Sequence, residues 1–104
     1  MYSIPCEAIF NRHPEVRRAA LVGVGPRGQQ QPVIIVEPMA GHLPHERIAR
    51  ARFLGQLRSL ALSNPLTDGI RHFMVRRRLP VDIRHNAKIF REKLAVWAAE
   101  RLKA

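Results

Sequence analysis

The chain has 104 residues, of which 46% are hydrophobic, and its 18 lysines and arginines against eight aspartates and glutamates give a net charge of +10. This length predicts one small domain, the hydrophobic content excludes an intrinsically disordered chain, and no apolar run reaches the roughly 18 residues that a membrane span needs. The single cysteine, Cys6, cannot form an internal disulfide and no signal peptide opens the chain, so we expect a cytoplasmic protein.

Nucleic acid is the obvious partner for so basic a chain. The basic residues are scattered, however, with Arg76, Arg77 and Arg78 as the only triplet, and aromatic residues make up 6% of the sequence without a stacking pattern. We therefore expect no specific nucleic acid partner, and a basic nucleic-acid-binding module stays as the alternative from a different functional class. The charge is also compatible with phosphate-bearing ligands or with an acidic counterpart on another domain.

The chain begins with a predicted short helix over residues 4–10. Pro5 suits the first helical turn, and His13 ends the helix because Pro14 pushes the preceding residue out of helical geometry. Cys6 is interpreted as a small buried hydrophobe rather than a reactive thiol, since no histidine motif accompanies it. For His13 we favour a role in ending the helix or bonding to the backbone over a catalytic one.

Two predicted strands follow this helix. Residues 16–24 form a short apolar run bounded by proline and glycine, which indicates a buried strand. A glutamine-rich turn separates this run from residues 32–37, whose β-branched side chains are typical of a central strand. Together with residues 72–76, which predict a third strand, they indicate an α+β fold with a small mixed or antiparallel three-stranded sheet flanked by helices.

The longest predicted helix lies between the second and third strands. Pro44 or His45 opens it, and Asn64 and Pro65 end it. Its apolar residues recur at three- and four-residue steps, so we expect this face to pack on the sheet. The stripe consists of Ala49, Phe53, Leu54, Leu57, Leu60 and Ala61.

No motif in the sequence completes an active site by itself. The sequence contains no glycine-rich phosphate loop and no nucleophile elbow. The five histidines lack the spacing that gathers metal ligands and one cysteine cannot complete a zinc site, so we expect no metal of this domain's own. The chain alone is therefore expected to be inactive as an enzyme.

A polar loop opened by Pro80 delivers Lys88 to the start of the last predicted helix. The loop is too polar for a core and suits contacts to a ligand. Its polar side chains are Asp82, Arg84, His85 and Asn86. From residue 89 the apolar positions recur with helical spacing to the C-terminus, which predicts a helix with one face packed inward. These positions are Phe90, Leu94, Trp97 and Ala98. The sequence thus places one lysine at the junction of a polar loop and an anchored helix, where it can contact a ligand, so Lys88 is the candidate functional residue.

Pro80, Lys88, Arg91 and Leu94 resemble the C-terminal motif of the adenylate-forming superfamily, which includes acyl-CoA synthetases and luciferases. In that motif a proline and a short polar loop precede Gly-Lys, and an arginine and a leucine follow at three-residue steps. The chain departs from the motif because Ala87 replaces the glycine and the polar loop is longer. The spacing of lysine, arginine and leucine is intact.

A second block of similarity to this superfamily extends over residues 5–36, and the resemblance implies that residues 1–104 form its C-terminal lid domain. The family's lysine contacts the acyl carboxylate and the α-phosphate during adenylation, a role that the resemblance assigns to Lys88. Candidates for further substrate or phosphate contacts are Arg84, His85 and Asn86. Structural positions of the motif are Pro80, Arg91 and Leu94. The resemblance also implies ATP with Mg²⁺, bound mainly by a large N-terminal domain.

Within this superfamily, residues 81–97 are most similar to the β-lactone synthetases of bacterial long-chain olefin biosynthesis. That resemblance implies an AMP-forming enzyme of the bacterial cytoplasm, which activates a long-chain fatty or β-hydroxy acid and closes the hydroxy acid to a β-lactone. The alternative is the lid of an ordinary fatty acyl-CoA ligase, since a longer loop with Ala87 also fits that class. The superfamily's hinge motif should lie just before Met1, so we expect a lid truncated from its own N-terminal domain.

Overall fold

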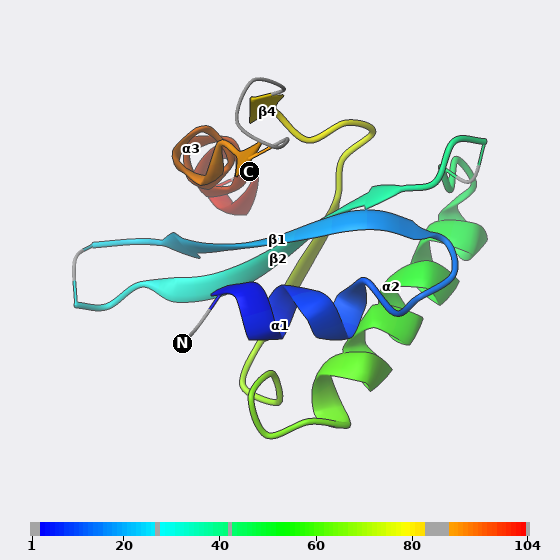
Figure 1. Cartoon of the computed structure of the whole chain (residues 1–104), viewed down its shortest axis with the longest axis horizontal. Helices are drawn as coiled ribbons and strands as arrows, with labels where there is room; N and C mark the ends of the chain where they lie inside the picture. The colour runs from blue at the N-terminus through cyan, green and yellow to red at the C-terminus, as the bar shows by residue number, and fades with distance from the viewer. Residues whose placement is uncertain (1–2, 27, 42, 83–87, 104) are drawn as a thin grey trace.

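The computed structural model describes residues 3–26, 28–41, 43–82 and 88–103, and one three-stranded sheet with helices on both faces dominates it (Figure 1). The strands are β1 (Val16–Val24), β2 (Gln31–Pro38) and β3 (His72–Val75), and the helices are α1 (Ser3–Phe10), α2 (Arg47–Leu62) and α3 (Arg91–Lys103). The strand order is β1-β2-β3, with β1 antiparallel and β3 parallel to β2. The predicted α+β fold with a mixed three-stranded sheet is therefore confirmed. None of the described helices is both long and apolar enough to cross a membrane.

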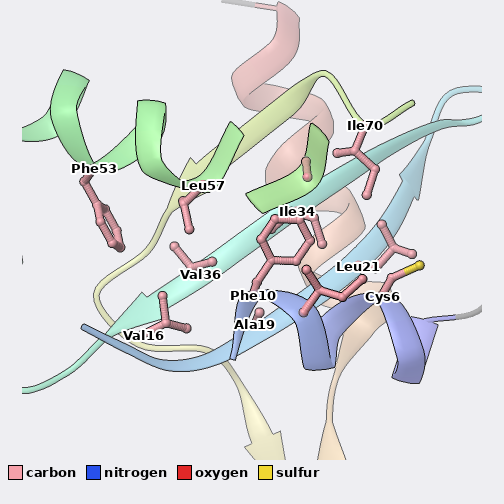
Figure 2. Packing of buried hydrophobic residues seen from close by; sticks show 12 residues of the cluster. Cys6, Phe10, Val16, Ala19, Leu21, Ile34, Val36, Phe53, Leu57 and Ile70 are labelled. Atoms are coloured by element: carbon pink, nitrogen blue, oxygen red, sulfur yellow. The ribbon is translucent and has the colours of Figure 1, made fainter. Parts of the chain in front are cut away.

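The central strand β2 divides the interior into two cores, because successive residues of a strand face opposite sides of the sheet. Ile34 and Val36 belong to the core beneath α1 and α2, whereas Val33 and Ile35 belong to the core beneath α3, and all four have 0% exposure. Figure 2 shows the first core, where Phe10 of α1 lies against the sheet. In Figure 1, α1 and α3 accordingly lie on opposite sides of β1 and β2.

The first helix and the turn after it have the structure expected from the sequence. Pro5 lies in the first turn of α1, where backbone N–H groups have no helical partner. Cys6 is 1% exposed, which confirms it as a buried residue, and its Sγ donates to the Leu66 carbonyl at 3.6 Å. His13 follows the helix and its Nδ1 accepts the Glu15 backbone N–H at 3.0 Å, so the predicted bond to the backbone is also confirmed.

The long helix α2 begins later than predicted. It starts at Arg47 rather than at Pro44 or His45, because the preceding Glu46 has an extended backbone with ψ 147° and its side chain makes no capping bond. The inward face is made by Phe53, Leu57 and Ala61. Ala49, which the predicted stripe included, is exposed, as are all residues of the first turn of α2. The predicted end before Asn64 and Pro65 is confirmed.

The segment before α3 was predicted wrongly. Lys88 does not lie at a helix start: residues Lys88–Ile89 form a short strand, β5, which pairs with β4 (Val81–Asp82). The Phe90 N–H donates to the Pro80 carbonyl at 2.9 Å, so this part of the backbone bonds across the ribbon and the helix begins only at Arg91. Phe90 is consequently 38% exposed, whereas Leu94 and Ala98 of the same predicted stripe have 0% exposure.

One buried carboxylate connects the two faces of the sheet. Glu7 of α1 is 6% exposed and accepts the backbone N–H of Leu21, on the edge strand β1, at 2.7 Å. Its two oxygens also accept Arg91 Nε at 3.0 Å and Nη2 at 2.6 Å. Since α1 and α3 cover opposite faces, this bidentate pair passes around the β1 edge and links the two cores.

We expect Glu7→Gln to lower the free energy of unfolding by about 2 kcal/mol, because glutamine retains an acceptor for Leu21 but leaves Arg91 without its counter-charge. Solvent screens part of this effect, since the Arg91 side chain is 33% exposed. Urea unfolding followed by the fluorescence of Trp97, the only tryptophan, measures the change. In a double-mutant cycle with Arg91→Met, the double variant should lose about 1 kcal/mol less free energy of unfolding than the sum of the two single variants.

Glu92→Gln is the matched control, because Glu92 is an exposed neighbour of Arg91 on α3. Its effect should stay within about 0.5 kcal/mol. Additive losses for Glu7→Gln and Arg91→Met would show that the pair does not hold the two faces together.

Candidate functional site

Lys88 lies on a short antiparallel ribbon, which Figure 1 shows beside α3. The ribbon pairs β4 with β5, and Lys88 lies opposite Asp82 in its register. For these two residues the structure describes the main chain. Residues 83–87, which connect the two strands, lie outside the described residues. They include the predicted candidates Arg84, His85 and Asn86.

The N-terminal end of the ribbon is fixed by a second buried carboxylate. Leu79 is 2% exposed in the core beneath α3, and its N–H donates to Glu37 Oε1 at 2.8 Å. Glu37 is 4% exposed, and its carboxylate lies 3.5 Å from Arg17 Nε and 3.7 Å from Arg18 Nε. One backbone donor and two guanidinium groups thus compensate the buried charge. Pro80 and β4 follow directly from this anchored residue.

The C-terminal end of the ribbon is also attached to the fold. The bond from the Phe90 N–H to the Pro80 carbonyl closes its base, and Arg91 is held to α1 by Glu7. Leu94, one helical turn later, is buried in the core beneath α3. The segment 79–91 is therefore attached to the fold at both ends, which restricts where the backbone of Lys88 can lie.

The surface next to the ribbon is electropositive. Arg17, Arg77 and Arg78 line a hollow of about 200 Å³ together with Glu37. The side chain of Arg17 is 57% exposed, and Arg77 and Arg78 are exposed as well. Three guanidinium groups against one carboxylate give a net positive potential, which attracts ligands that carry phosphate or carboxylate groups.

Groups that could carry thiol or metal chemistry are not gathered at this site. Burial raises the pKa of the Cys6 thiol above its ordinary value, so the reactive thiolate is disfavoured at neutral pH. Among the residues that the structure describes, no three His, Cys, Asp or Glu side chains lie close enough to hold a metal ion. The described site thus offers positioned cations and backbone groups.

The structure brings together only part of the predicted site. Pro80, Arg91 and Leu94 all meet at the base of the ribbon that carries Lys88. Glu7 and Glu37, which fix the two ends, were not predicted as part of the site. The available signal was an acidic residue within or directly after an apolar segment of a chain that is poor in acids.

The chain is similar over nearly its whole length to curated olefin β-lactone synthetases. Over 100 residues the chain is 52% identical to the synthetase of Xanthomonas campestris pv. campestris. This match covers 96% of the chain and 17% of that enzyme. Over 102 residues the chain is 45% identical to the synthetase of Stenotrophomonas maltophilia. This match covers 98% of the chain and 18% of that enzyme. The chain therefore spans less than a fifth of the length of these relatives. No family model matches the chain.

Solved structures share the fold. The anthranilate CoA ligase AuaEII in complex with anthranoyl-AMP superposes with a TM-score of 0.75 at 18% identity, over 98% of the chain and 19% of the ligase. The o-succinylbenzoate coenzyme A synthetase MenE from Bacillus subtilis, in complex with ATP and magnesium ion, gives a TM-score of 0.64 at 20% identity, over 90% of the chain and 17% of the synthetase. By sequence, the chain is thus similar over nearly its whole length to one segment of the olefin β-lactone synthetases, and by fold it is similar to one segment of solved CoA ligases and synthetases.

Proposed function

We propose that residues 1–104 are the C-terminal lid domain of an AMP-forming enzyme that converts a long-chain β-hydroxy acid to a β-lactone for bacterial olefin biosynthesis, and that Lys88 is its catalytic lysine. The observation that carries the role of Lys88 is its ribbon, attached at both ends through Glu37 and Glu7. The 52% identity to an olefin β-lactone synthetase supports the choice of reaction. The lid of an ordinary fatty acyl-CoA ligase is the alternative.

The first half-reaction explains why a lysine is needed. An oxygen of the substrate carboxylate forms a bond to the α-phosphorus of ATP, while the bond from that phosphorus to the bridging oxygen breaks and pyrophosphate leaves. Two anions approach one another in this step, so the Lys88 ammonium reduces their repulsion and stabilises the charge of the transition state. In the second half-reaction the β-hydroxyl oxygen attacks the acyl carbonyl, loses its proton, and AMP leaves.

ATP and Mg²⁺ would be held mainly by the N-terminal domain of such an enzyme. Relatives in fold have been solved with anthranoyl-AMP and with ATP and magnesium ion. The described residues of this chain offer no cluster of carboxylates for Mg²⁺. We therefore assign the ion to residues elsewhere in the enzyme. The bacterial cytoplasm, where ATP is abundant, is the proposed compartment.

The 104-residue chain alone should show no exchange of pyrophosphate into ATP with any long-chain fatty or β-hydroxy acid, because the proposal places the nucleotide site mainly on the N-terminal domain. The assay mixes the purified chain with ATP, acid and labelled pyrophosphate. The intact enzyme is the positive control. Exchange by the chain alone at a rate near that of the intact enzyme would refute its assignment as a lid.

Lys88→Ala in the intact enzyme should lower the rate of adenylate formation by roughly 10² or more, the scale for loss of one electrostatic stabiliser of a transition state. Binding of ATP should hardly change, and a presynthesised acyl-adenylate should still close to the lactone. Rapid quench of a single turnover separates these steps. Lys93→Ala, which removes an exposed lysine of α3, is the matched control and should leave both steps unchanged.

A different cation carries the reaction if Lys88→Ala adenylates at the wild-type rate while Arg84→Ala or His85→Ala abolishes adenylation. That outcome would mean that the longer loop has displaced the catalytic charge. Arg91→Ala should mainly lower stability, because Arg91 is engaged by Glu7.

Glu37→Ala in the intact enzyme should slow adenylation by about tenfold, because Leu79 loses its acceptor and the ribbon of Lys88 is less well positioned. Glu37→Gln should recover most of the rate, since its amide oxygen can still accept the Leu79 N–H. The rate of lactone closure from presynthesised adenylate serves as internal control and should not change. Equal losses in both half-reactions would mean that Glu37 stabilises the fold rather than positions Lys88.

A further inference from the structure

The sheet edge farthest from the Glu7–Arg91 pair is open along β3. β3 pairs with β2 on one side and is, like β1 at the opposite side, an edge strand of the described sheet. All four of its residues are only partly buried, whereas Val33 to Val36 of β2 are fully buried. An edge strand presents unpaired N–H and C=O groups that can pair with another extended segment.

Two neighbouring hollows lie along this edge. One, of about 410 Å³, is lined by the consecutive residues Arg71, His72, Phe73 and Met74 together with residues of α2 and Leu102 of α3. The other, of about 170 Å³, is lined by Phe73, Met74 and Val75 with residues of both helices. Successive side chains of a strand face opposite ways, so a hollow that touches consecutive residues runs along the edge of β3.

Helices on opposite faces of the sheet form the two walls of this groove, which we call the β3 groove. Phe73 packs with the core beneath α2, and Met74 packs with the core beneath α3. The shared lining of the two hollows is Leu54, Phe73 and Met74, so the floor is apolar and continuous. A segment that enters the groove would therefore bury side chains on both of its faces.

The β3 groove is strongly basic. Arg58 and Arg71 line the larger hollow, Arg50 and Arg101 line the smaller one, and neither lining contains an acidic residue. All four arginines are exposed, and within the described chain no ion pair engages them. Guanidinium groups without an acidic partner among the described residues lie on both walls, and they favour an occupant that carries carboxylates.

Trp97 explains why a nucleic acid fits this groove less well. The guanidinium groups of Arg76 and Arg101 lie 5.2 Å and 4.7 Å from the centre of its ring. A ring already covered by cations is not free to stack a base, and stacking platforms are what single-stranded nucleic acid needs. An extended peptide uses the other two features of the groove, the unpaired strand edge and the apolar floor.

We propose that the β3 groove binds an extended, acidic segment of a partner protein, which adds a strand to β3 and places its carboxylates against the arginines of α2 and α3. β3 has four residues, so the paired part of the segment is about 13 Å long at 3.3 Å per residue. This function is separate from that of Lys88 and goes beyond the proposed lactone synthesis. It also gives a role to some of the arginines that make up the net charge of +10.

The test uses the 104-residue chain and a synthetic peptide of about eight residues that repeats Glu-Glu-Val-Val, so that both faces of the extended peptide carry glutamate and its ends reach beyond the four residues of β3. The fluorescence of Trp97 reports binding, and the same peptide with lysine in place of glutamate is the control ligand. The acidic peptide should bind at least roughly tenfold more tightly than the basic one, with an affinity that falls as salt rises. Hydrogen exchange of the His72–Val75 amides should slow on binding.

Arg58→Glu and Arg101→Glu, one on each wall, should each weaken binding of the acidic peptide by roughly tenfold. Arg12→Glu makes the same change in net charge at an exposed site outside the groove and should change binding less than about twofold. Equal losses for all three variants, or unchanged exchange in β3, would overturn the proposal.

Two further results would also overturn it. Duplex DNA that binds more tightly than the peptide, with the same dependence on Arg58 and Arg101, would identify a nucleic acid site. An intact enzyme that fails to bind the peptide, although the 104-residue chain binds it, would mean that another part of the enzyme already covers the β3 groove.

Discussion

The carboxylate of Glu7 is the contact on which the rest of this fold depends. α1 and α3 cover opposite faces of the sheet and pack in two separate hydrophobic cores, so their packing sets the position of one helix relative to the other only through the sheet between them. Glu7 adds a direct link between the two helices because one carboxylate accepts a backbone N–H of the edge strand and two N–H groups of Arg91. Burying a charge costs free energy, and here three donors offset that cost. The result is a defined first residue for α3, and so a defined end for the ribbon that carries Lys88.

Glu37 repeats this arrangement at the other end of the ribbon. Its backbone donor is Leu79 and its cations are Arg17 and Arg18, so both buried carboxylates hold one main-chain N–H and at least one guanidinium group. A hydrophobic residue at either position could fill the space but could not direct a backbone donor. In a chain with so few acidic residues, these two anions are used to position the backbone around Lys88, while many cations stay at the surface.

The sequence predicted the features that rest on periodicity and missed those that rest on distant partners. The apolar runs of β1 and β2 and the stripe of α2 each extend over several turns or alternations, so their existence was readable. The ribbon was missed because each of its strands has two residues, too few for a pattern. Phe90 continues the helical spacing by chance, which moved the predicted helix start to residue 89. The pairing of Glu7 with Arg91 spans 84 positions, and no local signal reports it.

The helix α3 connects the two surfaces that this chain offers to other molecules. Arg91 at its start fixes the ribbon of Lys88 near the β1 edge, whereas Trp97 and Arg101 contribute to the β3 groove at the opposite edge of the sheet. Ten residues separate Arg91 from Arg101, and at a rise of 1.5 Å per residue they span about 15 Å of one rigid helix. A segment bound in the groove would therefore leave the ribbon accessible. The position of α3 itself is set by its packing in the core that contains Leu94 and Ala98 and by the bond of Arg91 to Glu7, so the two surfaces share one helix that is fixed to the sheet along its length.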